Sequence, residues 1–143
     1  MIFPNPNKYL RTAYVQGLPA YVNGIPVFVK KVPKSANPPS QYILITSQTK
    51  NQTAIGKDCF EWLCEIVVDC IYSGPAGFAA PVNNDDVEEN VQSFVLSGVE
   101  MPGWQVKSND FIGSIDMDAE TPTQSIERRV LTFQHWVNYN GTT

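Results

Sequence analysis

The chain contains a single histidine, His135, which limits the chemistry that its side chains can perform. Metal sites and catalytic pairs that need two imidazoles are excluded. A serine or cysteine nucleophile would need His135 as its base, together with an orienting acid. The segment Ile112–Asp116 lacks the second glycine of the Gly-x-Ser-x-Gly turn that exposes such a serine. We expect His135 to be a structural or interface residue, and a small enzyme that uses it is an alternative.

Three cysteines lie within one twelve-residue segment, at Cys59, Cys64 and Cys70. An odd number of cysteines in one continuous element is not a disulfide framework, and their spacing lacks the paired ligands of a zinc site. We interpret them as small buried residues of a protein made in a reducing cytosol. The turn Gly74–Gly77 lacks the Gly-Lys-Ser/Thr ending of a phosphate-binding loop. The sequence therefore predicts no metal and no cofactor.

Acidic residues alternate along one segment, at Asp116, Asp118 and Glu120. A calcium loop that began at Asp116 would need glycine at its sixth position, where the chain has Thr121. A solvated strand end explains these residues better. A second acidic group, from Asp85 to Glu89, suits the positive end of a helix dipole better than acid–base catalysis. These readings indicate a protein that is not an enzyme.

The composition is that of one domain, which we place at residues 1–143 with flexible ends at about 1–6 and 140–143. Hydrophobic residues make up 43% of the chain, enough for a sizeable core. Charged residues make up 17%, which fits a surface that is partly covered by a partner. The net charge of −4 argues against a broad phosphate-binding surface. No apolar run approaches the roughly 20 residues that span a bilayer, so no membrane partner is expected.

The first half of the chain is predicted to contain one helix and two strands. Asn7 is expected to cap a helix over Lys8–Gln16, which Gly17 ends. Strands are predicted over Pro26–Val32 and over the more hydrophobic Gln41–Ser47. The polar segment Gln48–Lys57 is predicted to be an exposed loop.

The segment Asp58–Tyr72 fits two patterns. Hydrophobic residues alternate from Phe60 to Tyr72, as in a strand. A helical stripe also exists, with Glu61 and Glu65 on its polar side. The β-branched and aromatic content favours the strand.

The second half is predicted to form a helix followed by two long strands. The helix covers Pro81–Ser97, with Asn84 or Asp85 as its cap. The strands cover Gln105–Asp118, bent near Asn109 and Gly113, and Gln124–Tyr139, with the loop Ala119–Thr123 between them. Because no strand–helix–strand repeat occurs, we predict an α+β fold: a mostly antiparallel sheet with two helices packed on one face.

Large amphipathic rings near the ends of predicted strands, and the adjacent cations Arg128 and Arg129, are candidates for contacts with a partner. These candidates are Trp104, Arg128, Arg129, Trp136 and Tyr139. For the two tryptophans, packing in the core is an equally good explanation.

Several segments occur in an order that is shared with a known family. They are Tyr9-Leu10-Arg11-Thr12-Ala13 in the first helix, Val32-Pro33, Pro38-Pro39-Ser40-Gln41-Tyr42-Ile43-Leu44-Ile45, Glu65-Ile66-Val67-Val68-Asp69, an acidic-capped helix, and Arg128-Arg129-Val130-Leu131-Thr132-Phe133. From about Asn7 to Tyr139, the chain resembles the tail-terminator (tail-completion) family of tailed bacteriophages, which sit at the neck. The likeness lies in element order and hydrophobic pattern, without a signature motif.

The resemblance implies a homo-oligomeric ring, a hexamer or dodecamer, at the tail end or the head–tail joint. Its partners would be neck or portal-side proteins, tail-tube proteins, and DNA that passes through the lumen without specific binding. It also implies a virion protein, assembled in the host cytoplasm, with no catalytic residues. Carboxylates that line a channel repel phosphates, so we expect Asp116, Asp118 and Glu120, or the polar segment Gln48–Lys57, to face the lumen. The alternative is a monomeric adaptor or inhibitor that binds a protein partner.

Overall fold

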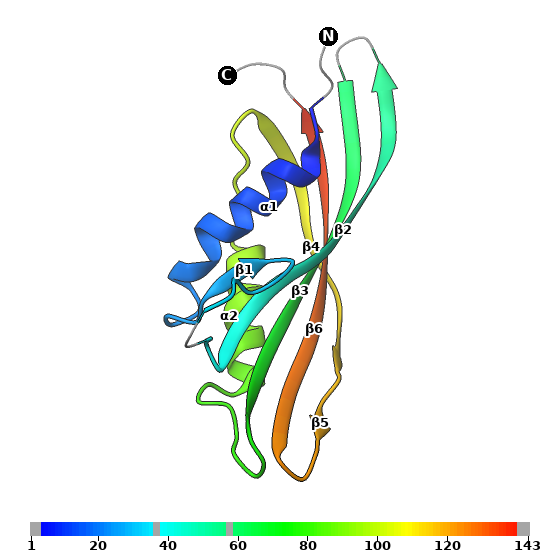
Figure 1. Cartoon of the computed structure of the whole chain (residues 1–143). Coiled ribbons are helices and arrows are strands. Elements are labelled where there is room, and N and C mark those ends of the chain that lie inside the picture. Colours follow the sequence, from blue (N-terminus) through cyan, green and yellow to red (C-terminus); the bar gives the residue numbers. More distant parts are fainter. Residues whose placement is uncertain (1–3, 36–37, 57–58, 140–143) are drawn as a thin grey trace.

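The computed structural model describes residues 4–35, 38–56 and 59–139. Figure 1 shows a long twisted sheet with helices beside it. The elements are α1 (Pro6–Gly17), the 3-10 turn η1 (Leu18–Ala20), β1 (Val27–Val29), β2 (Gln41–Gly56), β3 (Cys59–Pro75), α2 (Asn84–Leu96), β4 (Trp104–Asp116), β5 (Ala119–Glu120) and β6 (Gln124–Tyr139). The strand order is β1-β2-β3-β6-β4, and β5 also pairs with β6. Only the β1–β2 pair is parallel among the described strands. The predicted α+β fold with a mostly antiparallel sheet is confirmed.

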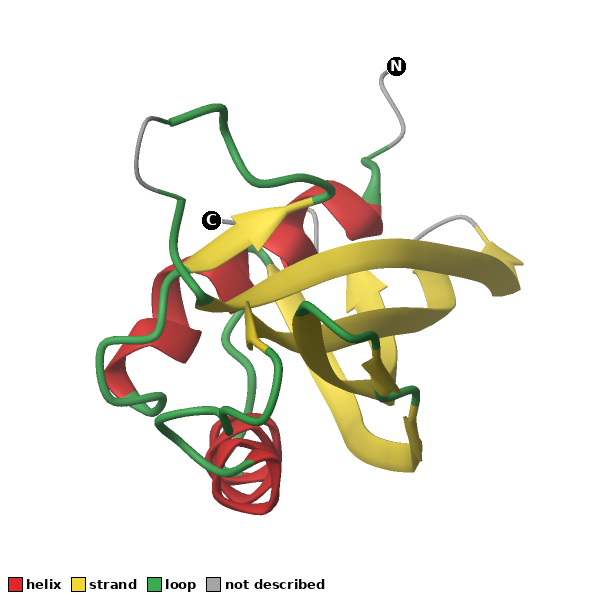
Figure 2. Cartoon of the chain, turned by 60° about the horizontal axis from the view of Figure 1, so that its bottom comes forward, coloured by secondary structure: helices red, strands yellow, loops and turns green. Residues whose placement is uncertain are grey.

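Both helices pack on one face of the sheet, which Figure 2 shows from below. The ring of Tyr14 in α1 lies against Phe133 of β6 and against Phe94 of α2. Alternate residues of the two central strands point toward the helices and are buried, among them Ile66 and Leu131. The opposite face of the sheet carries no helix in the described chain.

The first helix begins at Pro6, two residues before the Lys8 start that a cap at Asn7 would give. The side chain of Asn5 accepts a hydrogen bond from the backbone N–H of Asn7, and Pro6 occupies the first helical position. Proline suits this position because its missing N–H has no partner inside the helix. The prediction of Asn7 as the cap is therefore wrong. Of the predicted flexible ends, residues 1–3 and 140–143 lie outside the described residues, while Pro6 is buried in the helix.

Where the structure describes it, the segment Gln48–Lys57 is a strand and not the predicted loop, although Thr49 to Thr53 are exposed as expected. β2 continues to Gly56 and pairs with β3 along its length, with register shifts between Ile45 and Ser47 and between Gln52 and Ala54. Polar side chains are compatible with a strand at the solvent-facing end of a sheet, where backbone hydrogen bonds to β3 provide the order. The preceding strand β1 is shorter than predicted, because Lys30 adopts a positive φ of 65° and ends it.

The alternation in Asp58–Tyr72 identified the right secondary structure. Here β3 is a strand, and Cys64, Ile66 and Val68 are buried on the side of the helices. Asp58 lies outside the described residues. The second helix is also confirmed, although its cap is Asn83 and not Asn84 or Asp85. The loop Ala119–Thr123 contains the short strand β5, which sequence patterns did not indicate.

Candidate functional site

His135 is fully buried and connects three elements through hydrogen bonds. Its Nδ1 lies 2.9 Å from Oδ1 of Asn109 in β4, and its Nε2 lies 2.5 Å from the hydroxyl of Tyr14 in α1. Since an amide oxygen only accepts, Nδ1 carries the proton and Nε2 accepts from Tyr14. The histidine therefore holds α1 against the sheet.

Burial sets the protonation of this group. It lowers the pKa of His135 to about 4, because an imidazolium loses its hydration there. Burial also raises the pKa of the Tyr14 hydroxyl well above its usual value, so both partners are neutral at pH 7. A neutral, solvent-inaccessible imidazole whose two nitrogens are both occupied is a structural histidine.

The described cysteines fit the same pattern of chemically inert core residues. Burial raises the pKa of the Cys64 thiol to about 11 and that of Cys70 to about 12, so neither is a thiolate at neutral pH. The side chain of Cys59 lies outside the described residues. Among the described residues, no three potential metal ligands lie together. No described helix is long and apolar enough to cross a membrane.

The structure does not bring the five candidate interface residues together. Trp104 is 7% exposed and packs between Tyr9 and Tyr139, with ring centroids 5.9 and 5.1 Å away. Trp136 lies on the bare face of the sheet, is 41% exposed, and donates from Nε1 to the Thr53 hydroxyl. Each tryptophan therefore fits a different explanation. Trp104 belongs to the core, and Trp136 remains a candidate for contact with a partner.

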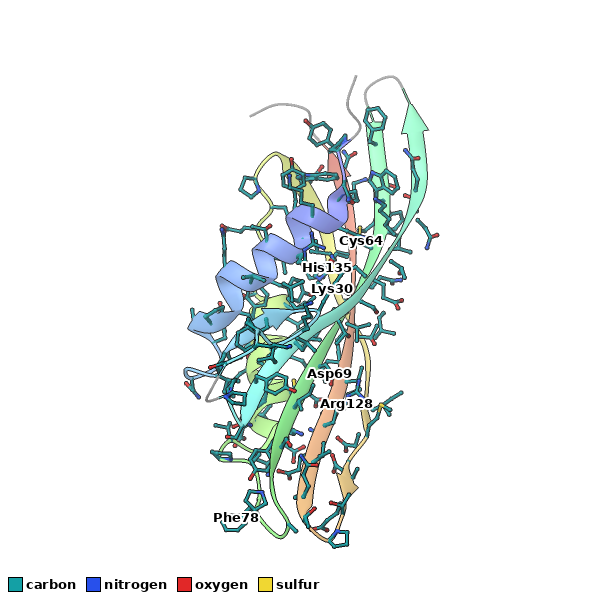
Figure 3. The ribbon with its side chains drawn as sticks, in the orientation of Figure 1. Lys30, Cys64, Asp69, Phe78, Arg128 and His135 are labelled. Atoms are coloured by element: carbon teal, nitrogen blue, oxygen red, sulfur yellow. The ribbon has the colours of Figure 1, made fainter. Side chains whose placement is uncertain are left out.

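Arg128 forms an ion pair on the bare face of the sheet. Its guanidinium Nε lies 2.9 Å from both carboxylate oxygens of Asp69, and Nη2 lies 2.6 Å from Oδ2. Asp69 is only 1% exposed. Figure 3 labels it near Arg128, which lies on the neighbouring strand β6. The carboxylate raises the pKa of Arg128. A buried acid on the face without helices is a feature that the sequence pattern did not reveal, because Asp69 occupies an outward position of the alternation.

Arg129 points to the opposite face and joins a helix to a strand. It binds Asp116 of β4 through Nε and Asp85 at the start of α2 through Nη1, each at 2.6 Å. The guanidinium lowers the pKa of Asp116 below its usual value. Both arginines therefore bind internal carboxylates, and their contact with a partner stays a prediction.

The three acids that we expected at a channel differ in their surroundings. Asp116 is held by Arg129, whereas Asp118 accepts a hydrogen bond from the backbone N–H of Arg128 at 2.9 Å. Glu120 accepts one from the N–H of Gly77 at 3.3 Å. All three are exposed, and they lie at the end of β4 and in the turn and strand that follow.

Exposed apolar side chains gather in the same region. Ile112, Ile115 and Met117 are 53%, 67% and 51% exposed. Sequence periodicity did not reveal this, because β4 changes register between Phe111 and Gly113, and such a shift alters which residues face the core.

An open cavity of about 380 Å³ lies where β1 ends beside β2. Its lining includes Arg11 of α1, Lys30, and Gln48 of β2. The side-chain amide of Gln48 bridges the elements, accepting from Arg11 and donating to the carbonyl of Asn7. The cavity thus places two cations beside the edge of the sheet.

Comparisons with known proteins add a likeness of fold. No family model matches the sequence, and no curated protein matches it. A chain in the solved structure of the virion of a native gene transfer agent (GTA) particle is similar in structure, with a TM-score of 0.65. The match covers 92% of this chain and 92% of that chain, at 14% sequence identity. This chain therefore shares its fold, over nearly its full length, with a chain of a virion particle.

Proposed function

We propose that the chain is a structural virion protein of a tailed bacteriophage or a phage-like particle. The observation that carries this proposal is the shared fold over 92% of both chains with a chain of a gene transfer agent virion. The order of elements, which resembles the tail-terminator family, supports the same class of protein. The proposed location is the virion, after assembly in the host cytoplasm.

Within the virion, the proposed form is a homo-oligomeric ring at the head–tail neck or the tail end. DNA would pass through the opening, and neck and tail-tube proteins would dock on either side. The low share of charged residues, 17%, supports extensive contact with other subunits. The exposed apolar residues at the end of β4 support it as well, since such groups commonly mark interfaces.

The proposed role includes no catalysis. The one histidine is neutral, buried and bonded at both nitrogens, and the described cysteine thiols are buried and protonated. These groups do not provide the exposed, activated nucleophile that group transfer needs. If His135 served a reaction, His135→Gln would abolish a measurable turnover while the protein stayed folded.

Electron microscopy and light scattering of the purified chain test the proposal. We expect particles of a single ring size with a central opening, and a mass that is a whole multiple of 15.9 kDa. Gold-labelled antibody should bind the neck or tail end of the virion. A monomer at every concentration that is also absent from virions would contradict the proposal and favour an adaptor that binds a protein partner.

A further inference from the structure

Charge is segregated along this chain. Residues 1–57 contain seven lysines and arginines and no acid, whereas residues 58–143 contain 14 acids and three cations. The formal charge is therefore +7 in the first segment and −11 in the second. The net charge of −4 conceals this difference.

The fold places the two segments at opposite edges of the sheet. The first segment forms α1, β1 and β2, and the strand order puts β1 and β2 at one edge (Figure 1). The second segment forms the rest, with β4 at the other edge and β5 beside β6. We define the basic edge as Arg11, Lys30, Lys31, Lys34 and Lys50, and the acidic edge as Asp110, Asp116, Asp118 and Glu120.

Among the described residues, ion pairs use the cations of the second segment only. Lys107, Arg128 and Arg129, the three cations of the second segment, all pair with carboxylates of that segment. None of the six described cations of the first segment forms a salt bridge with a described carboxylate. The basic edge therefore keeps its full charge for an external partner.

Both edges also present unpaired backbone. Strand β1 pairs with β2 only as far as Ile45, so the described residues from Ser47 onward have a strand on one side only. Strand β4 pairs with β6 and has no described strand on its outer side. Long unpaired edges form hydrogen bonds readily with another strand.

The strand directions favour joining these two edges. Three successive antiparallel pairings lie between β2 and β4, so β4 runs opposite to β2. When copies that point the same way stand side by side, β4 of one copy meets β2 of the next in the antiparallel direction. The cavity lined by Arg11 and Lys30 is open beside this edge and suits an incoming carboxylate.

We propose that a second copy of this chain occupies the basic edge, with its acidic edge facing Arg11, Lys30 and Lys31. This inference rests on the self-assembly proposed above and identifies the surface that closes the ring. One chain carries both complementary surfaces at opposite edges, which is the requirement for head-to-tail association and ring closure. Asp110, Asp118 and Glu120 then lie at the boundary between subunits and not on the wall of a channel.

Charge reversal of one edge at a time tests the proposal. K30E/K31E lowers the formal charge of the basic edge from +5 to +1, and D110K/E120K raises the formal charge of the acidic edge from −4 to 0. All four side chains are exposed, and none forms a salt bridge with a described residue. We expect each variant alone to associate at least about tenfold more weakly than the unmodified chain in sedimentation velocity. An equimolar mixture should assemble again, because the acidic edge of K30E/K31E is unchanged and meets the unchanged basic edge of D110K/E120K. At the other contact, the introduced glutamates face the introduced lysines.

Controls separate this surface from self-assembly in general. E65K reverses one charge on the central strand β3, away from both edges, and should associate as the unmodified chain does. Circular dichroism must show native folding for all variants. If both double variants assemble normally, the edge contact is wrong while the ring remains. If the unmodified chain and the mixture are both monomeric from 50 to 500 mM salt, the ring is wrong as well.

A duplex oligonucleotide in the same experiment tests nucleic acid as the occupant of the basic edge. We expect no binding to the assembled chain, since the neighbouring subunit neutralises Lys30 and Lys31. Binding that K30E/K31E abolishes, without any change in subunit association, would overturn the proposal and assign the basic edge to DNA.

Discussion

At the scale of single residues, the buried histidine decides how the chain responds to pH. Tyr14, His135 and Asn109 form one hydrogen-bonded group that requires a neutral imidazole. Its pKa of about 4 in the folded chain lies below the value near 6.5 of an exposed histidine. Between these pH values the unfolded chain binds more protons than the folded chain. The contribution of His135 to the unfolding free energy is therefore fully present above about pH 6.5 and decreases as the pH falls toward 4.

The first prediction follows from this shift. Lowering the pH from 7 to 4 should remove about 3 kcal/mol of unfolding free energy through His135 alone. Urea unfolding between pH 4 and 7 measures the loss. His135→Gln should reduce the slope of unfolding free energy against pH, by an amount that corresponds to at most one bound proton. Equal slopes for the two proteins would show that the histidine is not responsible.

Arg128 supplies the second prediction at this scale. Replacing Arg128 with methionine leaves the buried carboxylate of Asp69 without its bidentate partner, and we expect a loss of about 3 kcal/mol. The double variant Arg128→Met/Asp69→Leu should regain most of the stability, because apolar residues replace both charges. Urea titrations of the three proteins test this, and a loss below about 0.5 kcal/mol in the single variant would indicate that solvent screens the pair.

At the scale of elements, the contact between the two helices sets how closely they pack. Gly17 ends α1 where a Cβ atom would overlap the Phe94 ring of α2. The glycine therefore lets the end of one helix approach a buried aromatic ring of the other.

The third prediction tests this close approach. Gly17→Ala should lower the unfolding free energy by about 1–2 kcal/mol, since the overlap outweighs the better helix propensity of alanine. Gly113→Ala in β4 is the matched control, because no atom lies within 4 Å of its added Cβ. Thermal unfolding of both variants compares them, and equal melting temperatures would contradict the proposed contact.

At the scale of the whole molecule, both helices and the sheet share a single hydrophobic core. One cluster contains Leu10 of α1, Val91 of α2 and Phe133 of β6. The fourth prediction is a single cooperative unfolding transition for residues 1–143, as expected of one domain. Ellipticity at 222 nm and tryptophan fluorescence should give the same midpoint for the weakly associating variant D110K/E120K. Two separate midpoints would show that the helices or the distal strands unfold independently.

The sequence by itself determined the class of fold, both α-helices and the long strands β4 and β6, and it favoured a strand over a helix for β3. These elements have strong periodicity and clear end signals, and local preference agrees with the final structure. Asn5 and Asn83 were missed as caps because a neighbouring residue fits the same pattern. The polar half of β2 was missed because its order comes from pairing with β3, a contact that the local sequence does not encode.

Only the tertiary structure decided which charged and aromatic residues are available to a partner. Trp104 and Trp136 look alike in the sequence, yet one is buried by Tyr9 and Tyr139 and the other lies on the bare face. The sequence shows that basic and acidic residues lie in separate segments. Only the strand order shows that these segments form opposite edges of the sheet, with β1 and β2 at one edge and β4 at the other. Electrostatic attraction between copies depends on where charges lie in space, and long-range strand pairing sets those positions.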